Sequence, residues 1–284
     1  MHNHNPMSKY LTTSFCFLLL LLTACGPPNS TNQEGEKDGM AEFSEDKEFQ
    51  EAHEEPVATH YKGKGQMITF PTTDGEEGSA YVIAPAHTSD KALFVIHEWW
   101  GLNDHIKREA EMLFDSLGDV LVMALDLYDG QVATTREKAG EYMQSAKPER
   151  IRAIIQGALG QAGSGSKVAT IGWCFGGGWS LKASIMAGSQ GAGCVMYYGM
   201  PVESAADLGA LRADVLGIFA EKDEWITPKV VADFEAICKM ANKNLEVHSY
   251  DADHAFANPS SPRYVEEAAQ KANKLALSFL RERL

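Results

Sequence analysis

The sequence predicts an α/β fold in which helices cover both faces of a mostly parallel central sheet. The first observation is that apolar runs of strand length, rich in β-branched residues, alternate with amphipathic stretches of helix length. The second is size and composition: 284 residues, 44% hydrophobic and 23% charged, suit one large globular domain or two small ones. The net charge of −14 argues against nucleic acid as a partner, because phosphate binding needs basic patches.

The first 24 residues are predicted to be a signal peptide that is not part of the fold. A polar start with Lys9 leads into the apolar run 15–22, which is too short to span a bilayer. The run ends in Leu-Thr-Ala-Cys at residues 22–25, which resembles a bacterial lipobox. That resemblance implies cleavage before Cys25, a lipid on Cys25, and, with Gly26 following, a cell-envelope location at the outer membrane facing the periplasm. The alternative is a secreted protein that is cut nearby.

Residues 25–60 are predicted to be a flexible tether that follows the lipidated cysteine. Residues 26–60 contain ten acidic residues and two lysines, and few large aliphatic side chains. Such a composition buries too little apolar surface to offset the entropy of folding. The alternative is an ordered N-terminal extension. Residues 61–284 then form the folded domain.

The predicted strands and helices alternate through this domain. The first two strands flank the turn 72–78, and the later apolar runs have the continuous pattern of buried parallel strands. Helix 103–118 places Ile106, Ala110, Leu113, Phe114 and Leu117 on one face. The expected strands are 66–70, 79–84, 92–98, 119–128, 167–173, 193–199, 214–221 and 245–251, and the other expected helices are 148–163, 177–188, 228–241 and 261–284.

A cysteine flanked by glycines follows the strand 167–173. Gly172, Cys174 and Gly176 form the pattern G-x-nucleophile-x-G, which is typical of a sharp strand-to-helix turn. The glycines permit the tight turn and the close approach of helix and strand. The start of the following helix favours the thiolate of Cys174, because a helix N-terminus carries partial positive charge.

Two residues at the ends of later strands are expected to act with Cys174. In a parallel sheet, functional residues collect at the carboxyl ends of strands, and Asp223 and His254 each follow one. The chain order of nucleophile, acid and histidine is that of an α/β-hydrolase fold. His254 would take the thiol proton, and Asp223 would fix the imidazole tautomer. Asp251 and Asp253 are the alternatives to Asp223.

The backbone is expected to stabilise the oxyanion. The amide of Phe175 would point at the developing negative charge, and such a donor can contribute roughly 3 to 4 kcal/mol. A second donor is expected from the loop after the third strand, in the sequence HEWWG.

Six motifs over residues 61–284 resemble the dienelactone hydrolase family, in family order. They are HEWWGLNDHIK, ALDLY, GWCFGGGWSL, YYG, EKDEWITP and YDADHAFAN. The resemblance implies Cys174, Asp223 and His254 as the catalytic triad, and the amide of Trp99 as the second oxyanion donor. It also implies that Glu98 pairs with the resting thiol and releases it when substrate binds. The family opens lactones and related esters through an acyl-cysteine.

One position departs from the family pattern. Characterised dienelactone enzymes have H-x-F-x-R after the histidine, with an arginine that holds the substrate carboxylate, but here Asn258 takes its place. Arg263 is the nearest arginine that could substitute. Arg136, Arg150 and Arg152 are the candidates for the family's other substrate-binding arginine.

The predicted function is therefore hydrolysis of a small-molecule ester or lactone, with Trp100, Trp225 and Asn258 as candidate substrate-binding residues. The triad and oxyanion hole supply the chemistry, so neither a metal nor an organic cofactor is expected, and a monomer is favoured. The alternatives are an esterase acting on a neutral carbohydrate or lipid ester, and a tethered binding protein without turnover. A thiol-redox role is disfavoured because Cys194 and Cys238 form no C-x-x-C pair with Cys174.

Overall fold

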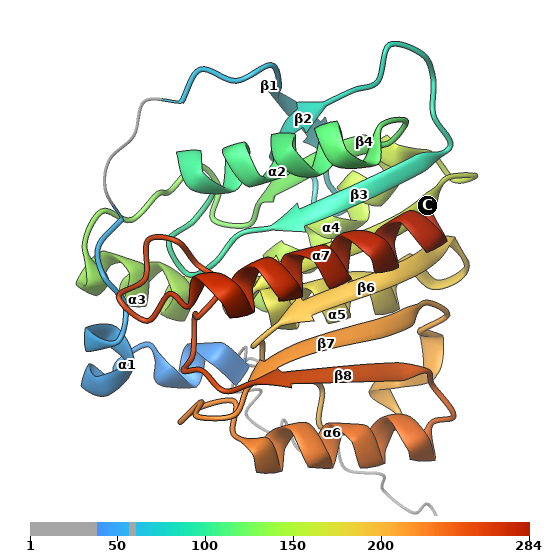
Figure 1. The fold of residues 1–284 in the computed structure, drawn as a ribbon. Helices are drawn as coiled ribbons and strands as arrows, with labels where there is room; N and C mark the ends of the chain where they lie inside the picture. Colours follow the sequence, from blue (N-terminus) through green and yellow to red (C-terminus); the bar gives the residue numbers. More distant parts are fainter. Residues whose placement is uncertain (1–38, 57–60) are drawn as a thin grey trace, which may run out of the picture. The chain divides into compact units, whose positions relative to one another are not determined.

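A computed structural model describes residues 39–56 and 61–284. A single eight-stranded sheet forms the centre of the domain, in the order β1-β2-β4-β3-β5-β6-β7-β8 (Figure 1). The strands are β1 (Gln66–Pro71), β2 (Glu77–Ile83), β3 (Lys91–Ile96), β4 (Leu121–Asp126), β5 (Lys167–Trp173), β6 (Gly191–Tyr197), β7 (Asp214–Ala220) and β8 (Leu245–Tyr250). All eight predicted strands are confirmed, with ends shifted by a few residues.

The sheet is parallel from β4 to β8 and antiparallel at the β1 end. β1 pairs with β2, and β2 with β4, in antiparallel register, whereas every later pair is parallel. The short turn between β1 and β2 allows only antiparallel pairing, and the helices between later strands provide the crossovers that parallel pairing needs. The predicted mostly parallel α/β fold is therefore confirmed.

Helices lie on both faces of this sheet, as predicted. α2 (Asp104–Leu117) and α7 (Glu266–Arg283) cover the face toward the viewer in Figure 1, and α4 (Pro148–Ala162) and α5 (Phe175–Ala187) cover the other face. α6 (Pro228–Met240) lies below β8 in that view. The central strands are buried on both sides, with β3 buried from Ala92 to Ile96, which explains their continuous apolar runs.

Several short elements were not predicted. They are α3 (Arg136–Ser145) and the 3₁₀ turns η1 (Gly39–Phe43), η2 (Gly188–Gln190) and η3 (Asp207–Ala210), together with α1 (Lys47–Glu51). For residues 39–56 the structure differs from the expected flexible tether, because these residues belong to the same compact unit as the sheet. Met40 and Phe49 are fully buried and anchor the segment. The side chain of Asp46 caps α1 by accepting from the amides of Glu48 and Phe49.

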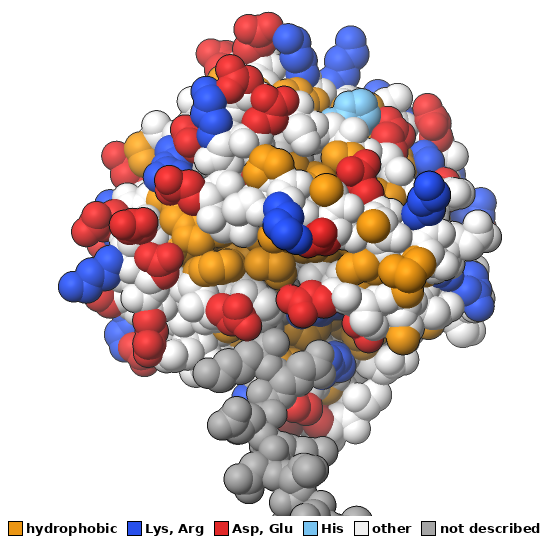
Figure 2. All heavy atoms as spheres, turned by 90° about the horizontal axis from the view of Figure 1, so that it is seen from below, with side chains coloured by type: hydrophobic (Ala, Val, Ile, Leu, Met, Phe, Trp, Pro, Cys, Tyr) orange, Lys and Arg blue, Asp and Glu red, His pale blue; other side chains and the backbone are white. Residues whose placement is uncertain are grey.

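The predicted signal peptide, membrane attachment and lack of basic patches concern the N-terminus and the surface of the protein. The signal peptide and Cys25 lie outside the described residues. No helix in the described part of the chain is long and apolar enough to cross a membrane. On the face seen in Figure 2, the basic side chains of the described residues are interspersed with acidic ones rather than gathered into one patch.

Candidate active site

Cys174 sits at the turn between β5 and α5, in a strained backbone conformation. Its φ of 54° and ψ of −119° are unusual for a residue with a side chain. The flanking glycines make this turn possible. A Cβ on Gly172 would lie 2.0 Å from the carbonyl oxygen of Gly176, and one on Gly176 would lie 2.3 Å from that of Ile96. The structure thus gives a steric reason for both glycines of the motif.

His254 and Asp223 meet at the same edge of the sheet. The Nδ1 atom of His254 lies 2.7 Å from Oδ2 of Asp223, and both side chains are fully buried. The other carboxylate oxygen accepts from the amides of Trp225 and Ile226, each at 2.9 Å. Burial by itself raises the pKa of Asp223, but His254 and these two amides outweigh it and leave the pKa below its usual value.

The nucleophile candidate lies beside this pair. The Sγ atom of Cys174 and one ring nitrogen of His254 are within 4.8 Å of each other. With Nδ1 of His254 held by Asp223, the Nε2 atom is the one left to face a proton donor, and among the described residues it has no hydrogen-bond partner. Asp251 instead pairs with Lys222 at 2.7 Å. The histidine partner is therefore Asp223 and not Asp251.

Glu98 is buried near the end of β3 and is held by Asn258. The Nδ2 atom of Asn258 donates to Oε2 of Glu98 at 2.6 Å, and its Oδ1 accepts from the amide and hydroxyl of Ser260. Burial raises the pKa of Glu98 to about 7, against the lowering effect of the Asn258 hydrogen bond. Thus Asn258, where the family pattern has arginine, contacts the buried carboxyl group directly.

A pocket of about 230 Å³ opens beside Glu98. Its lining includes Trp100, Glu109, Trp173 and Asn258, and no arginine or lysine among the described residues. Burial raises the pKa of Glu109 to about 7. Trp100 and Asn258, two of the three predicted substrate-binding residues, line this pocket. Of the two predicted oxyanion donors, Phe175 opens α5 and Trp99 follows β3.

Trp225 does not line this pocket. Its Nε1 donates to Oδ2 of Asp46 at 3.2 Å, and its ring meets Phe49 edge-on at 5.2 Å and lies 5.6 Å from the His254 ring. The Arg263 guanidinium lies over the Trp225 ring at 5.5 Å. Both residues therefore lie at the side of the site covered by residues 39–56.

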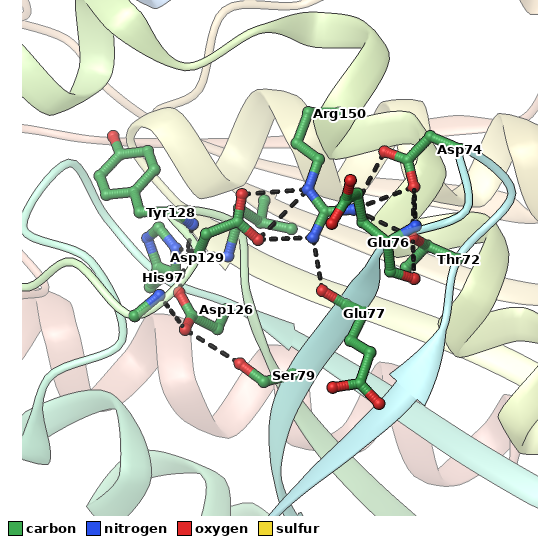
Figure 3. A network of polar contacts seen from close by, with 12 residues as sticks. Thr72, Asp74, Glu76, Glu77, Ser79, His97, Asp126, Tyr128, Asp129 and Arg150 are labelled. Atoms are coloured by element: carbon green, nitrogen blue, oxygen red, sulfur yellow. Dashed lines mark hydrogen bonds and ion pairs between the residues drawn. The ribbon is translucent and has the colours of Figure 1, made fainter.

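Arg150 and Arg136 have partners outside the pocket. Arg150 binds Asp74, Asp129, Thr72 and the carbonyl of Glu77, a network drawn in Figure 3. Arg136 donates to the backbone carbonyl of His53 at 2.6 Å. Neither they nor Arg152 line the pocket beside Glu98. In Figure 3, Asp126 accepts from Ser79 and from backbone amides of the turn after β4, so its carboxylate caps that turn.

Sequence reasoning missed a histidine and a phenylalanine that reach the site from residues 39–56. The His53 ring centroid lies 5.5 Å from that of His254, and the Phe49 ring contacts Trp99, Trp225 and His254. Burial, followed by the neighbouring His254, lowers the pKa of His53 to about 3, so its imidazole is neutral. The only signal in the sequence was an N-cap residue, Asp46, three positions before Phe49.

The order of the strands and the strained turn at the end of β5 are those of the α/β-hydrolase fold. The chain belongs to the dienelactone hydrolase family, whose model matches residues 79–284.

The chain is also similar to several proteins of known name. Protein usf of Aquifex pyrophilus is 28% identical over 78% of this chain and 99% of its own length. Carboxymethylenebutenolidase 1 of Cupriavidus pinatubonensis is 26% identical over 75% of this chain and 95% of its own. A dienelactone hydrolase-like promiscuous phosphotriesterase from metagenomic libraries has a similar fold, with a TM-score of 0.65, 24% identity, and coverage of 78% of this chain and 99% of its own.

Proposed function

We propose that this protein hydrolyses a carboxylic ester or lactone through an acyl-cysteine formed on Cys174. The observation that carries the proposal is the buried His254–Asp223 hydrogen bond of 2.7 Å, next to a cysteine on a strained strand-to-helix turn. A hydrogen-bonded carboxylate holds the imidazole with Nε2 available as a base and stabilises its protonated form. The buried surroundings strengthen this interaction.

The proposed reaction has two steps, acylation of Cys174 and hydrolysis of the acyl-cysteine. The thiol proton passes to His254, Sγ forms a bond with the carbonyl carbon, and the oxyanion is held by the amides of Phe175 and Trp99. The carbon–oxygen bond then breaks, and the imidazolium protonates the departing alkoxide. In the second step His254 takes a proton from water, the hydroxide adds to the thioester carbon, and the carbon–sulfur bond breaks to release the acid. The imidazolium of His254 then returns its proton to Sγ, which restores the thiol.

The proposal is tested by measuring kcat/KM of the wild type and of variants with a panel of aryl esters and lactones. Cys174→Ala should lower kcat/KM by at least about 10³-fold, because residues that act as one catalytic unit lose most of the rate when any one is removed. Cys238→Ala, which removes a buried cysteine in α6, is the matched control. Mass spectrometry of the wild type should detect an acyl adduct on Cys174. Equal rates in the wild type and Cys174→Ala would exclude the mechanism.

We infer that the substrate is neutral rather than anionic. The pocket beside Glu98 contains Glu98 and Glu109, and Asn258 stands where the family pattern has a carboxylate-binding arginine. Any ionisation of the two acids would repel a substrate carboxylate. Matched lactones with a carboxylate or its methyl ester test this inference, and the methyl ester should have the higher kcat/KM. A clear preference for the carboxylate would contradict it.

A further inference from the structure

His53 brings a second imidazole to the candidate nucleophile. The residue is 4% exposed, and its ring packs against Phe49 at 4.5 Å and Trp99 at 4.8 Å. Its Nδ1 atom bonds to the carbonyl oxygen of Phe49 at 2.7 Å, and its own carbonyl accepts from Arg136. The hydrogen bond at Nδ1 fixes the direction of the ring, and the hydrogen bond from Arg136 holds the backbone of His53 in place.

Three side chains converge there with the donor atoms of a metal site. The Sγ atom of Cys174 and one ring nitrogen each of His53 and His254 all lie within 4.8 Å of one another. In both histidines Nδ1 is bound to an oxygen, of Phe49 and Asp223 respectively. In both, Nε2 is buried and has no hydrogen-bond partner among the residues that the structure describes.

This arrangement is the one that zinc-binding histidines have. A ligating imidazole binds the metal through one nitrogen and donates the other N–H to a carboxylate or a backbone carbonyl, which fixes its tautomer. One thiolate and two imidazoles are a ligand set for Zn²⁺ in tetrahedral geometry, with the fourth position open. Zn–N and Zn–S bonds of about 2.0–2.3 Å put ligand atoms roughly 3.5 Å apart. A separation of 4.8 Å between two ligand atoms therefore has to shrink by about 1.3 Å when the metal binds.

A packing role alone does not explain the cluster. Each buried nitrogen without a hydrogen-bond partner costs about 1–3 kcal/mol, and the cluster contains two of them, Nε2 of His53 and Nε2 of His254. A bound cation satisfies both nitrogens at once.

We propose that His53, Cys174 and His254 form a binding site for a borderline-soft divalent cation such as Zn²⁺, and that this cation inhibits the enzyme. Binding releases the thiol proton to solvent and forms one bond to Sγ and one to each Nε2. The nucleophile and its base are then both occupied, so hydrolysis stops; this consequence rests on the function proposed above. The His53 bond also fastens residues 39–56 over the site.

The metal site is tested on the full chain with Co²⁺ and Zn²⁺, independently of hydrolysis. Co²⁺ added to the reduced, metal-free protein should give a sulfur-to-cobalt charge-transfer band, and prior alkylation of Cys174 should abolish the band without any mutation. Calorimetry should find one tight Zn²⁺ per chain. His53→Gln should weaken binding by at least about tenfold, since it removes one of three ligands. His87→Gln, at an exposed histidine paired with Asp119, should bind like the wild type.

Hydrolysis gives the second readout. The concentration of Zn²⁺ that halves the rate, measured against each variant's own metal-free rate, should rise in His53→Gln by the same factor as the dissociation constant. Absence of the cobalt–thiolate band, or binding by His53→Gln as tight as in the wild type, would overturn the metal site. If the cobalt band forms but Cys174 supports no hydrolysis, the metal site stands and the proposed enzyme function fails. If hydrolysis depends on Cys174 but no cobalt band forms, the enzyme function stands and the metal site fails.

Discussion

At the scale of single residues, burial of Glu98 makes the stability of the fold depend on pH. The pKa of Glu98 is about 7 in the folded protein, against 4.5 for an exposed glutamate, and the main cause is burial. Between these pH values the folded state binds more protons than the unfolded state, so the free energy of unfolding falls as the pH rises. The stability that protonated Glu98 contributes is fully present below pH 4.5 and is lost as the pH rises above about 7.

Glu98→Gln should therefore gain stability relative to the wild type as the pH rises. Glutamine keeps the shape and can still pair with Asn258, but it does not ionise. Between about pH 4 and about pH 8 the difference in the free energy of unfolding should move in favour of the variant by up to about 3 kcal/mol. Urea unfolding at a series of pH values measures it. Glu221→Gln, at an exposed glutamate, is the control, and a pH-independent difference for Glu98→Gln would contradict the expectation.

The glycines around Cys174 give a second prediction at this scale. In Gly176→Ala the new Cβ would lie 2.3 Å from the carbonyl oxygen of Ile96 and 2.4 Å from that of His97. Backbone atoms can move aside only at a high cost in energy. We therefore expect the free energy of unfolding to fall by more than about 3 kcal/mol, or the protein not to fold, as measured by urea unfolding and circular dichroism. Gly160→Ala in α4 meets nothing within 4 Å and should gain about 0.5–1 kcal/mol. A Gly176→Ala protein as stable as the wild type would refute the steric argument.

At the scale of elements, the strands of the sheet could be predicted and the N-terminal segment could not. β3 and β5 are buried on both faces, so nearly every residue in them is apolar and the pattern alone identifies them. Residues 39–56 are held by a few side chains whose partners lie far away in sequence, such as Asp46 with Trp225. Local composition describes this segment as an acidic tether, because the signal lies in tertiary contacts.

Phe49 is the apolar anchor of that segment over the site. It is fully buried and contacts Trp99, Trp225, His53 and His254. Truncating a buried phenylalanine costs about 3–5 kcal/mol, and a short terminal segment can open without global unfolding. In Phe49→Ala, iodoacetamide in the presence of a chelator should therefore alkylate Cys174, which is 1% exposed in the described fold, at least about ten times faster.

The control for this prediction is a buried phenylalanine away from the site. Phe279→Ala in α7 should lower the free energy of unfolding without accelerating alkylation of Cys174 under native conditions. Equal alkylation rates in the wild type and Phe49→Ala would mean that residues 39–56 do not limit access to the sulfur. Peptide mass spectrometry distinguishes Cys174 from Cys194 and Cys238, which are also buried.

At the scale of the whole molecule, the sheet brings residues far apart in sequence to one edge. Glu98, Cys174, Asp223 and His254 follow β3, β5, β7 and β8, and parallel strands end on the same side. The positions of Cys174, Asp223 and His254 directly after strands were therefore enough to predict the edge where they meet. What the sequence could not supply is the partner of each side chain, such as Asn258 for Glu98, since hydrogen bonds between loops depend on the folded geometry.

Arg150 shows that a candidate substrate residue can be structural instead. Its guanidinium joins α4 to the turn between β1 and β2 through Asp74, and to the turn after β4 through Asp129 (Figure 3). Side-chain hydrogen bonds with Asp129 and Asp74 raise the pKa of Arg150, and its side chain is 18% exposed, so these bonds are only partly screened by water.

Arg150→Met should therefore lower stability while leaving catalysis nearly intact. Loss of the charged hydrogen bonds should reduce the free energy of unfolding by about 1–3 kcal/mol. Because Arg150 does not line the pocket beside Glu98, kcat/KM for a neutral ester should stay within about twofold of the wild type at a temperature where both are folded. Lys138→Met removes an exposed pair with Glu141 and should change stability by less than about 0.5 kcal/mol. A large rise in KM for Arg150→Met, with stability unchanged, would instead assign this arginine to substrate binding.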